Sequence, residues 1–243
     1  MARKPPLMSS ILAAISVSLA APASADDTNP RSVSRYVSPQ HAATETSAIA
    51  AIGPFRVLDG ARVALVDITD SRSPAQFAAL LEAYPHIAVI EFVEAPGTHD
   101  DLANLQLGRM IRARGIATIA PEGGSIRSGA VELFIAGAAR YIDEAAEFAV
   151  HGWTDDRGLG AEDYPAQAPE HRRYIDYYME MDMNIQQAQA FYAMTNTVPF
   201  DQALWLTGSE MRGWLDDATM LAEQAQGAPI LSASRLDFHP VLQ

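Results

Sequence analysis

The sequence predicts an α/β fold whose strands run mainly parallel and alternate with helices. From Val57 onward, short apolar runs typical of strands are separated by longer stretches with helical periodicity. One of these runs, 87–93, is apolar almost throughout, as in a strand that is buried on both faces of its sheet. Strands separated by helices pair in parallel through right-handed crossovers, which gives a series of βαβ units.

The first two strands and the helix between them are predicted from composition and turn residues. Apolar and β-branched residues dominate 61–68, and such residues favour strands. Ser73 and Pro74 then begin a helix. Proline suits a first turn because the N–H group that it lacks would have no partner within the helix there. The run 87–93 is the second strand, and the residues of 95–98 form a turn after it.

The next helix begins at Asp100 or Asp101 and ends near Gly115. An aspartate side chain accepts hydrogen bonds from the free N–H groups of a first turn, and glycine suits the left-handed conformation that ends many helices. The run 116–120 is the third strand, and a glycine-rich turn at 123–125 follows it.

The C-terminal half is predicted from the same kinds of pattern. Stretches of small and apolar residues indicate buried elements, whereas polar stretches with glycine and proline indicate surface loops. The elements expected here are a buried helix over 128–139, a short strand over 148–151, a loop over 154–169, a long helix over 171–195 and a short helix from Thr207 or Ser209.

The N-terminus has the pattern of a secretory signal peptide over residues 1–25. Arg3 and Lys4 precede a mostly apolar run, and the Ala-Ser-Ala sequence ending at Ala25 is the small-x-small pattern that signal peptidase cleaves. The apolar run is shorter than the roughly 20 residues that a bilayer-spanning helix needs. We therefore expect cleavage after Ala25, a periplasmic or secreted location, and no membrane span in the remaining chain.

After cleavage, the chain is expected to consist of a linker or loosely ordered arm over 26–50 and a single α/β domain over 51–243. The arm is polar and contains several serine, threonine and proline residues. The rest of the chain is long enough to enclose one sizeable hydrophobic core.

The charge balance and the lack of cysteine exclude several classes of function. The net charge is −13, and loss of Arg3 and Lys4 with the signal makes the remaining chain more negative still. Nucleic acids and anionic membranes need basic surfaces, so neither is an expected partner. Without cysteine there is no disulfide, thiolate metal site or cysteine nucleophile. The histidines show no paired ligand spacing, so we expect no metal and no other cofactor.

Ser128 and His151 are the candidate catalytic pair. Ser128 lies at a predicted helix N-terminus, where free N–H groups and the helix dipole can stabilise an oxyanion. His151 ends the next predicted strand, which can return to the start of that helix and supply the base that a serine nucleophile needs. Spacing alone leaves open that Ser128 is only a helix cap and His151 a strand-end histidine. Ser125 is an alternative nucleophile.

The spacing of several short motifs also matches a known family. They are 90–98 with its Pro-Gly-Thr turn, Ser128-Gly129-Ala130 followed by 136–138, the strand 148–151, and a closing segment over 205–215. In this combination the chain resembles the ClpP/crotonase fold, and within it the proteolytic subunit of the Clp protease and ClpP-like periplasmic proteins.

The resemblance implies both a fold and a site. It implies repeated ββα units in a spiral, a mainly parallel sheet and a C-terminal helical segment. It assigns Ser128 as nucleophile, His151 as base, and the N–H groups of Thr98 and Gly129 as oxyanion donors. It also implies a peptide or protein substrate and a homo-oligomer.

The sequence departs from the family pattern at the turn, beside the nucleophile and at the acid. Thr98 replaces the second glycine of the turn, Arg127 is an unusual neighbour for a nucleophile, and Ala203 aligns with the family aspartate. Asp201 is the acid we assign, ahead of Asp176 and Asp182.

Two functions follow from these residues. The first is an exported serine hydrolase, most simply a peptidase. The second is a catalytically inactive member of the fold that binds a peptide or protein through the same cleft. A Ser–Lys dyad is excluded, because Lys4 is the only lysine and it is removed with the signal.

Overall fold

The computed structural model describes residues 39–216 and 235–237, which all fall within one unit of the chain, Val37–Gln243. The predicted signal peptide over 1–25 and the first part of the expected arm lie outside these residues. None of the helices in the described ranges is long and apolar enough to cross a membrane.

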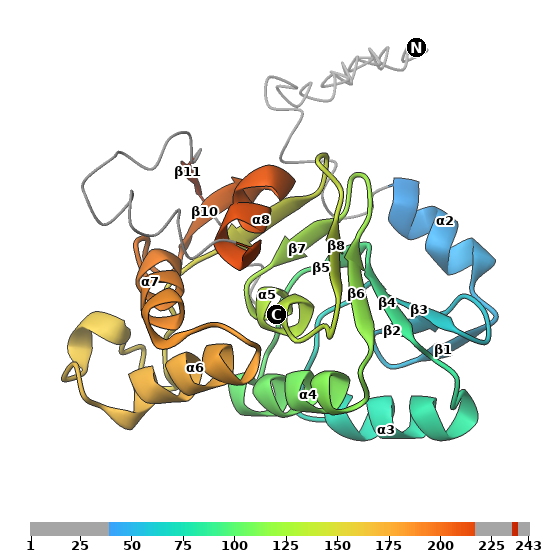
Figure 1. Ribbon diagram of the computed structural model, residues 1–243, viewed down its shortest axis with the longest axis horizontal. Coiled ribbons are helices and arrows are strands. Elements are labelled where there is room, and N and C mark those ends of the chain that lie inside the picture. Colours follow the sequence, from blue (N-terminus) through green and yellow to red (C-terminus); the bar gives the residue numbers. More distant parts are fainter. Residues whose placement is uncertain (1–38, 217–234, 238–243) are drawn as a thin grey trace, which may run out of the picture. The chain divides into compact units, whose positions relative to one another are not determined.

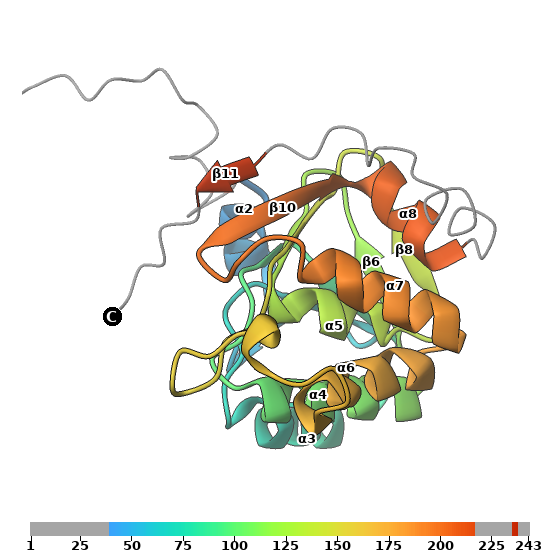
Figure 2. The same ribbon diagram turned by 90° about the vertical axis from the view of Figure 1, so that its left-hand side faces the viewer.

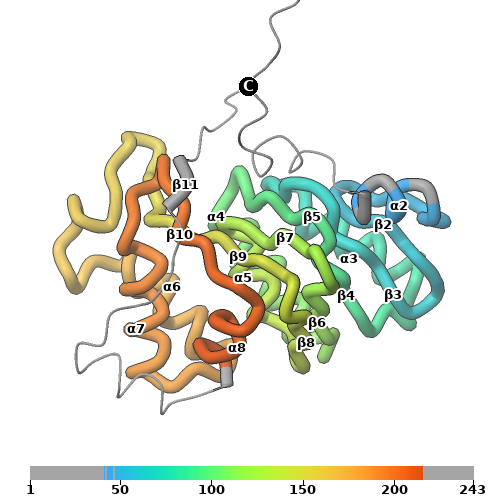
Figure 3. The backbone as a smooth tube through the Cα atoms, turned by 90° about the horizontal axis from the view of Figure 1, so that it is seen from above, coloured from blue at the N-terminus to red at the C-terminus, as the bar shows by residue number. Residues whose placement is uncertain are grey.

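The described strands form two sheets, and most of the pairs that involve the central strands are parallel (Figure 1). The first sheet has six strands in the order β1-β2-β3-β4-β6-β8, and the second has five in the order β11-β10-β9-β7-β5. Figure 3 shows the strands of the second sheet following one another from β5 to β10. The first sheet consists of β1 (Ala50–Ile52), β2 (Phe55–Val57), β3 (Arg62–Leu65), β4 (Val89–Phe92), β6 (Ala117–Ala120) and β8 (Arg140–Ile142). The second consists of β5 (Glu94–Ala95), β7 (Ser125–Arg127), β9 (Glu147–Val150), β10 (Gln202–Thr207) and β11 (Arg235–Asp237).

Eight helices accompany the sheets in the described ranges. Helices α3, α4 and α5 follow one another in space, with α4 packed between the other two, and α6 packs against α7 (Figure 2). The helices are α2 (Pro39–Ser47), α3 (Ser73–Ala83), α4 (Asp101–Ala113), α5 (Gly129–Ile135), the short 3₁₀ helix η1 (Ala161–Asp163), α6 (Pro169–Glu180), α7 (Ile185–Thr195) and α8 (Gly208–Asp216).

The chain visits both sheets before each of its central helices. It runs from β4 in the first sheet to β5 in the second and then into α4, and from β6 to β7 and then into α5. A third pair, β8 and β9, repeats the step. The prediction of repeated ββα units in a mainly parallel α/β fold is therefore confirmed.

The predicted elements around Ser128 are wrong in part, because the sequence analysis missed the short strands β5, β7 and β8. The expected turn at 123–125 leads directly into β7, the expected helix over 128–139 is only α5, and β8 follows it. Strands of two or three residues such as β5, β7 and β8 are too short to show an alternating pattern in the sequence.

The predicted long helix over 171–195 is wrong, because the chain breaks it into α6 and α7. Asp182 has a φ of 75°, which no α-helical residue adopts. The Asn184 side chain then accepts a hydrogen bond from Gln187 N at 2.9 Å and caps α7.

The end of the expected arm has regular structure. Helix α2 occupies Pro39–Ser47, and β1 begins at Ala50 as one strand of an antiparallel pair with β2. Arg56 Nε in β2 lies 2.8 Å from Glu45 Oε1 of α2. Helix α2 and β1 are therefore joined to the first sheet through this ion pair and this strand pairing.

The core holds α5 rigidly between the two sheets. Phe134 of α5 has no exposed surface, and its ring packs edge-on against Phe92 at 5.5 Å and Phe148 at 5.2 Å between centroids. Val131 and Leu133 are equally buried. Side chains that fill a core in this way fix the helix position, so the residue before α5 has a defined place in the fold.

Candidate active site

Ser128 lies between β7 and α5 in a strained backbone conformation. Its φ is 49° and its ψ is −134°, a region that side chains with a Cβ rarely adopt. In the described ranges, only Ser128 and Asp182 combine a positive φ with a side chain. The Ser128 N–H donates to Ala149 O at 2.8 Å, which holds this backbone in place. Strain that is maintained in this way is often found at functional sites.

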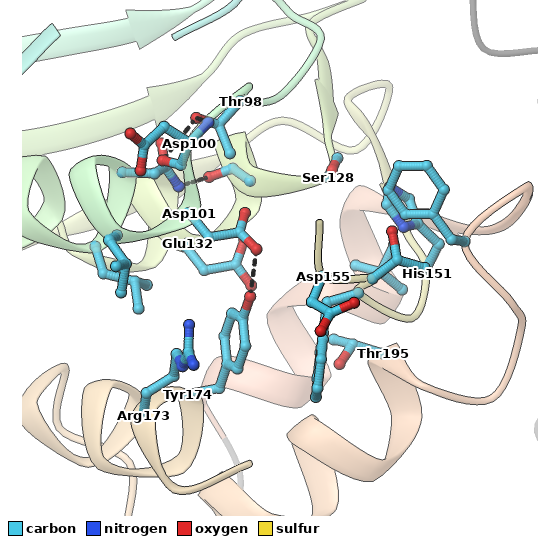
Figure 4. A pocket seen from close by; sticks show the side chains of 18 of the residues that line it. Thr98, Asp100, Asp101, Ser128, Glu132, His151, Asp155, Arg173, Tyr174 and Thr195 are labelled. Carbon is cyan, nitrogen blue, oxygen red and sulfur yellow. Dashed lines mark hydrogen bonds between the residues drawn. The ribbon is translucent and has the colours of Figure 1, made fainter. Parts of the chain in front are cut away.

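The Ser128 side chain does not cap the helix. It stands at the N-cap position of α5, yet it makes no cap hydrogen bond. Its residue instead lines a cavity of about 650 Å³ (Figure 4). The interpretation of Ser128 as a simple helix cap is therefore not supported, because its hydroxyl makes no capping hydrogen bond.

The turn after β5 approaches Ser128 closely at Gly97. Gly97 has a φ of 129°, and a Cβ on it would lie 2.9 Å from Ser128 Cβ and 3.3 Å from Ser128 Oγ. Only glycine fits this close approach without a shift of the backbone. The sequence-predicted turn and the predicted nucleophile are thus in direct contact.

Thr69 fixes the direction of the N–H group of Thr98. The Thr69 N–H donates to Gly97 O at 3.0 Å, and the His99 N–H donates to Thr69 O at 2.8 Å. N–H groups of successive residues in an extended segment point to opposite sides, so that of Thr98 points away from Thr69.

Thr98 and Gly129 lie next to each other beside Ser128. A Cβ on Gly129 would lie 2.5 Å from Thr98 Cγ2. Gly129 is the first residue of α5, so its N–H has no partner within the helix. Within residues 39–216 and 235–237, neither the Thr98 nor the Gly129 N–H donates to another backbone group. Both groups remain available to a ligand.

The Thr98 side chain is held away from the turn backbone. Its Oγ1 accepts a hydrogen bond from Asp100 N at 3.1 Å, at the start of α4. Asp100 itself caps α4 as predicted, by accepting from Ala103 N at 3.0 Å. The extra Cβ, which departs from the family glycine, is therefore accommodated by the start of α4.

Asn104 joins the two parts of the site, and the sequence analysis missed it. This α4 residue is 2% exposed, and its Nδ2 donates to Gly129 O at 2.6 Å. Its Oδ1 accepts from Thr69 Oγ1 at 2.9 Å. Asn104 therefore ties the start of α5 to the segment that holds the Gly97 turn. A polar residue on the apolar face of a helix was the available signal.

His151 follows β9 and lines the same cavity as Ser128 (Figure 4). Its Nδ1 lies 2.9 Å from Gly152 O. A carbonyl can only accept, so Nδ1 carries the proton and Nε2 keeps its lone pair. The Phe200 ring packs edge-on against the imidazole at 4.9 Å. Burial lowers the pKa of His151, which favours the neutral form that a general base needs.

The structure brings Ser128 and His151 to one cavity without joining them. Both residues are described, and no hydrogen bond forms between them. Their side chains would have to approach for proton transfer to occur. Hydrogen bonds at catalytic sites often tighten only when substrate is bound.

Asp201, the assigned acid, is exposed in the turn before β10. It borders a depression that shares Trp153 and Phe200 with the Ser128 cavity. Asp182 pairs with Arg112, and Asp176 is exposed on α6. Ala203, which aligns with the family aspartate, is fully buried in β10. The Gly152 carbonyl occupies the position at His151 Nδ1 that a carboxylate has in a triad.

Arg127 forms a buried ion pair with Glu94 in the second sheet, and Ser125 is hydrogen-bonded to the same guanidinium. Arg127 Nη1 donates to Glu94 Oε1 at 2.6 Å and to Ser125 Oγ at 2.8 Å. All three side chains are buried, and none of them lines the cavity. Ser125 is therefore a structural partner of Arg127, and the alternative nucleophile is placed away from His151.

The cavity walls are acidic and aromatic. Burial raises the pKa of Glu132 to about 7, and its Oε1 accepts from Tyr178 Oη at 2.8 Å. Tyr174 Oη donates to Asp101 Oδ2 at 2.6 Å. Trp153 Nε1 donates a hydrogen bond to Tyr192 Oη at 2.8 Å. These hydrogen bonds hold the aromatic side chains in fixed positions.

Among the described residues, no group of three or more potential ligands could hold a metal ion.

Comparisons with known proteins return structural neighbours of low sequence identity. No protein-family model and no curated protein sequence matches the chain. Among solved structures, a ClpP1 mutant from Listeria monocytogenes is similar at 13% identity and a TM-score of 0.47, covering 64% of this chain and 88% of that one.

Two mutants of the membrane-bound stomatin-specific protease 1510-N are also similar. One has 17% identity and a TM-score of 0.40, covering 74% of this chain and 92% of its own. The other, in complex with a substrate peptide, has 15% identity and a TM-score of 0.39, covering 71% and 86%. Both proteases are ClpP-like, as is the family that the sequence resembles. The fold assignment itself rests on the ββα order of the strands and helices.

Proposed function

We propose that the protein is a serine hydrolase, most simply a peptidase, with Ser128 as nucleophile. The observation that carries this proposal is the strained backbone at Ser128, which presents the hydroxyl to a cavity beside two available N–H groups. Such donors stabilise the oxyanion of an attacked carbonyl.

The proposed reaction is acyl transfer in two halves. His151 Nε2 takes the Ser128 hydroxyl proton as Oγ bonds to the substrate carbonyl carbon, and the oxyanion is bound by the N–H groups of Thr98 and Gly129. His151 then gives the proton to the leaving amine as the C–N bond breaks. Water attacks the acyl-enzyme by the same steps and frees the carboxylic acid and Ser128.

Gly152 has the orienting role in this proposal. Its carbonyl fixes the tautomer and direction of His151, as a carboxylate does in a complete triad. A neutral carbonyl stabilises the imidazolium less than a carboxylate does. A hydrolase whose histidine is oriented by a carbonyl is therefore expected to be slower than one whose histidine is oriented by an acid.

A second function is supported by the lack of a hydrogen bond between Ser128 and His151. Ser128 and His151 are not hydrogen-bonded to each other, which would suit a module that binds a peptide without cleaving it. The two functions differ in a single measurable property, the reactivity of Ser128.

Labelling with a fluorophosphonate probe separates the two. The purified full chain should be labelled, whereas Ser128→Ala and His151→Ala should lose the label. Ser125→Ala is the matched control, because it removes a buried hydroxyl that lies outside the cavity, and it should keep the label. Absence of labelling in the wild type would reject the hydrolase and support the binding module.

Location and assembly are parts of the same proposal. Export rests on the signal-peptide pattern over 1–25, and N-terminal sequencing of the protein from a secreting host would test cleavage after Ala25. Assembly into a homo-oligomer rests on the sequence resemblance, and light scattering would test it. A monomer at all concentrations would reject the second expectation.

A further inference from the structure

Glu132 lies one helical turn from Ser128 on the cavity side of α5. Residues four apart in a helix share a face and are separated by a rise of about 6 Å. Glu132 and Ser128 both line the cavity, as this spacing requires. The Glu132 carboxylate therefore lies in the cavity wall about one helical turn beyond Ser128, where the attacked carbonyl is expected.

The Glu132 carboxylate lines the cavity and is held in place by hydrogen bonds. Oε1 accepts from Tyr178 Oη at 2.8 Å, and the carboxylate also receives a hydrogen bond from its own backbone N–H. It is not in an ion pair with any described cation.

Most of the other charged groups that line the cavity are acids. They are the carboxylates of Asp100, Asp101, Asp155 and Asp156, and the guanidinium of Arg173 is the cation among them. Arg173 comes from α6, and within the described part of the chain it makes no ion pair with any of these acids. Asp155 forms an ion pair with Arg157, and the remaining acids still outnumber Arg173 in the cavity lining.

Aromatic rings complete the walls around this charge. Tyr174 stacks on Trp153 at 6.2 Å and on Tyr192 at 6.0 Å between centroids. Tyr faces attract ammonium and guanidinium groups, and their rings also pack against the aliphatic part of a long side chain. A carboxylate and aromatic faces in one cavity match a long cationic side chain in both its parts.

We infer that the cavity binds the lysine or arginine side chain of the peptide residue that carries the scissile carbonyl, with Glu132 as its counter-ion. This inference rests on the proposed function, because it places the scissile carbonyl at Ser128. An extended lysine or arginine side chain covers about the rise of four helical residues, so its charged end reaches Glu132.

The test uses peptide anilides that differ only in the residue before the cleaved bond. For the full chain, kcat/KM should be at least about tenfold higher with lysine or arginine than with norleucine, and lowest with glutamate. Glu132→Gln should bring the lysine-to-norleucine ratio close to one. Glu122→Gln, an exposed acid outside the cavity, is the control for net charge and should keep the ratio.

A second variant and a binding arm make the result independent of folding and of catalysis. Asp101→Asn keeps an acceptor for Tyr174 and should lower the ratio in part. Calorimetry of Ser128→Ala with the corresponding peptide amides should show the same preference in Kd.

The outcomes separate the two proposals. Cleavage without a preference for basic residues, or a preference for glutamate through Arg173, would overturn the inference and leave the hydrolase standing. Preferred binding of lysine peptides without any labelling of Ser128 would support the inference and reject the hydrolase. Absence of both preference and labelling would overturn both.

Discussion

Replacing Ser128 with glycine should stabilise the fold while it removes the proposed nucleophile. At φ 49° and ψ −134°, a Cβ is crowded by the backbone, and glycine relieves this crowding. Alanine keeps the Cβ and so keeps the strain. The comparison of Ser128→Gly with Ser128→Ala therefore isolates the conformational energy from loss of the hydroxyl.

The magnitude follows from two opposing effects. Backbone strain of this kind costs about 1–3 kcal/mol, and it disappears in the glycine variant. The extra freedom of glycine in the unfolded chain costs about 0.5–1 kcal/mol. Ser128→Gly should thus be more stable than Ser128→Ala by about 1 kcal/mol, the reverse of the usual order of these residues.

Urea unfolding followed by circular dichroism measures the difference. Ala130→Gly is the matched control, since Ala130 is a buried α5 residue and should lose about 1 kcal/mol or more on the same substitution. Equal slopes against urea would show that the variants expose similar surface. If Ser128→Gly is less stable than Ser128→Ala, the backbone at Ser128 is not strained, and the main support for the proposed nucleophile is lost.

Four further predictions concern the surroundings of Ser128. Gly97→Ala should slow fluorophosphonate labelling by about 100-fold, because its Cβ displaces Ser128; Gly115→Ala, also at positive φ but with open space around it, should label normally. Asn104→Leu should cost about 1–3 kcal/mol in urea unfolding and slow labelling, since Gly129 O and Thr69 Oγ1 lose their partner; unchanged labelling would show that this link does not position the site. Glu94→Gln should destabilise by about 3 kcal/mol because it leaves Arg127 buried without a counter-ion, and a stability equal to wild type would contradict this. Because the pKa of Glu132 is raised from 4.5 to about 7, the folded protein holds this proton longer than the unfolded chain as pH rises between these values, so stability should fall by at most about 3 kcal/mol across that range, and the fall should be smaller in Glu132→Gln.

The sequence predicts the fold well where an element is long or has a clear terminal residue. Helix α4 begins at its Asp100 cap, and α3 begins with Pro74 in its first turn, both as expected. The prediction fails where tertiary contacts decide. Strand β7 is three residues long and is defined by its pairing with β5 and β9, which only the folded chain provides. The break at Asp182 lies in a stretch whose composition is helical throughout.

The sequence predicts the turns that form the site, but it does not predict which polar side chains contact each other there. Glycine at 97 and the serine before α5 are visible in the sequence because turn geometry restricts which residues fit. The roles of Asn104, Glu132 and the Gly152 carbonyl depend on which groups meet in space, and a single sequence does not encode such pairs in any local pattern.

The Gly152 carbonyl has a consequence for how the site responds to acid. A carboxylate that orients a histidine can itself be protonated, and its loss of charge then adds a second acidic step to the rate profile. A peptide carbonyl does not titrate in this range. Loss of the proposed activity on acidification should therefore include the titration of His151 and no titration of the Gly152 carbonyl. Because burial lowers the pKa of that imidazole, its titration should lie on the acid side of the usual histidine range, and the proposed hydrolase activity should persist in a mildly acidic medium.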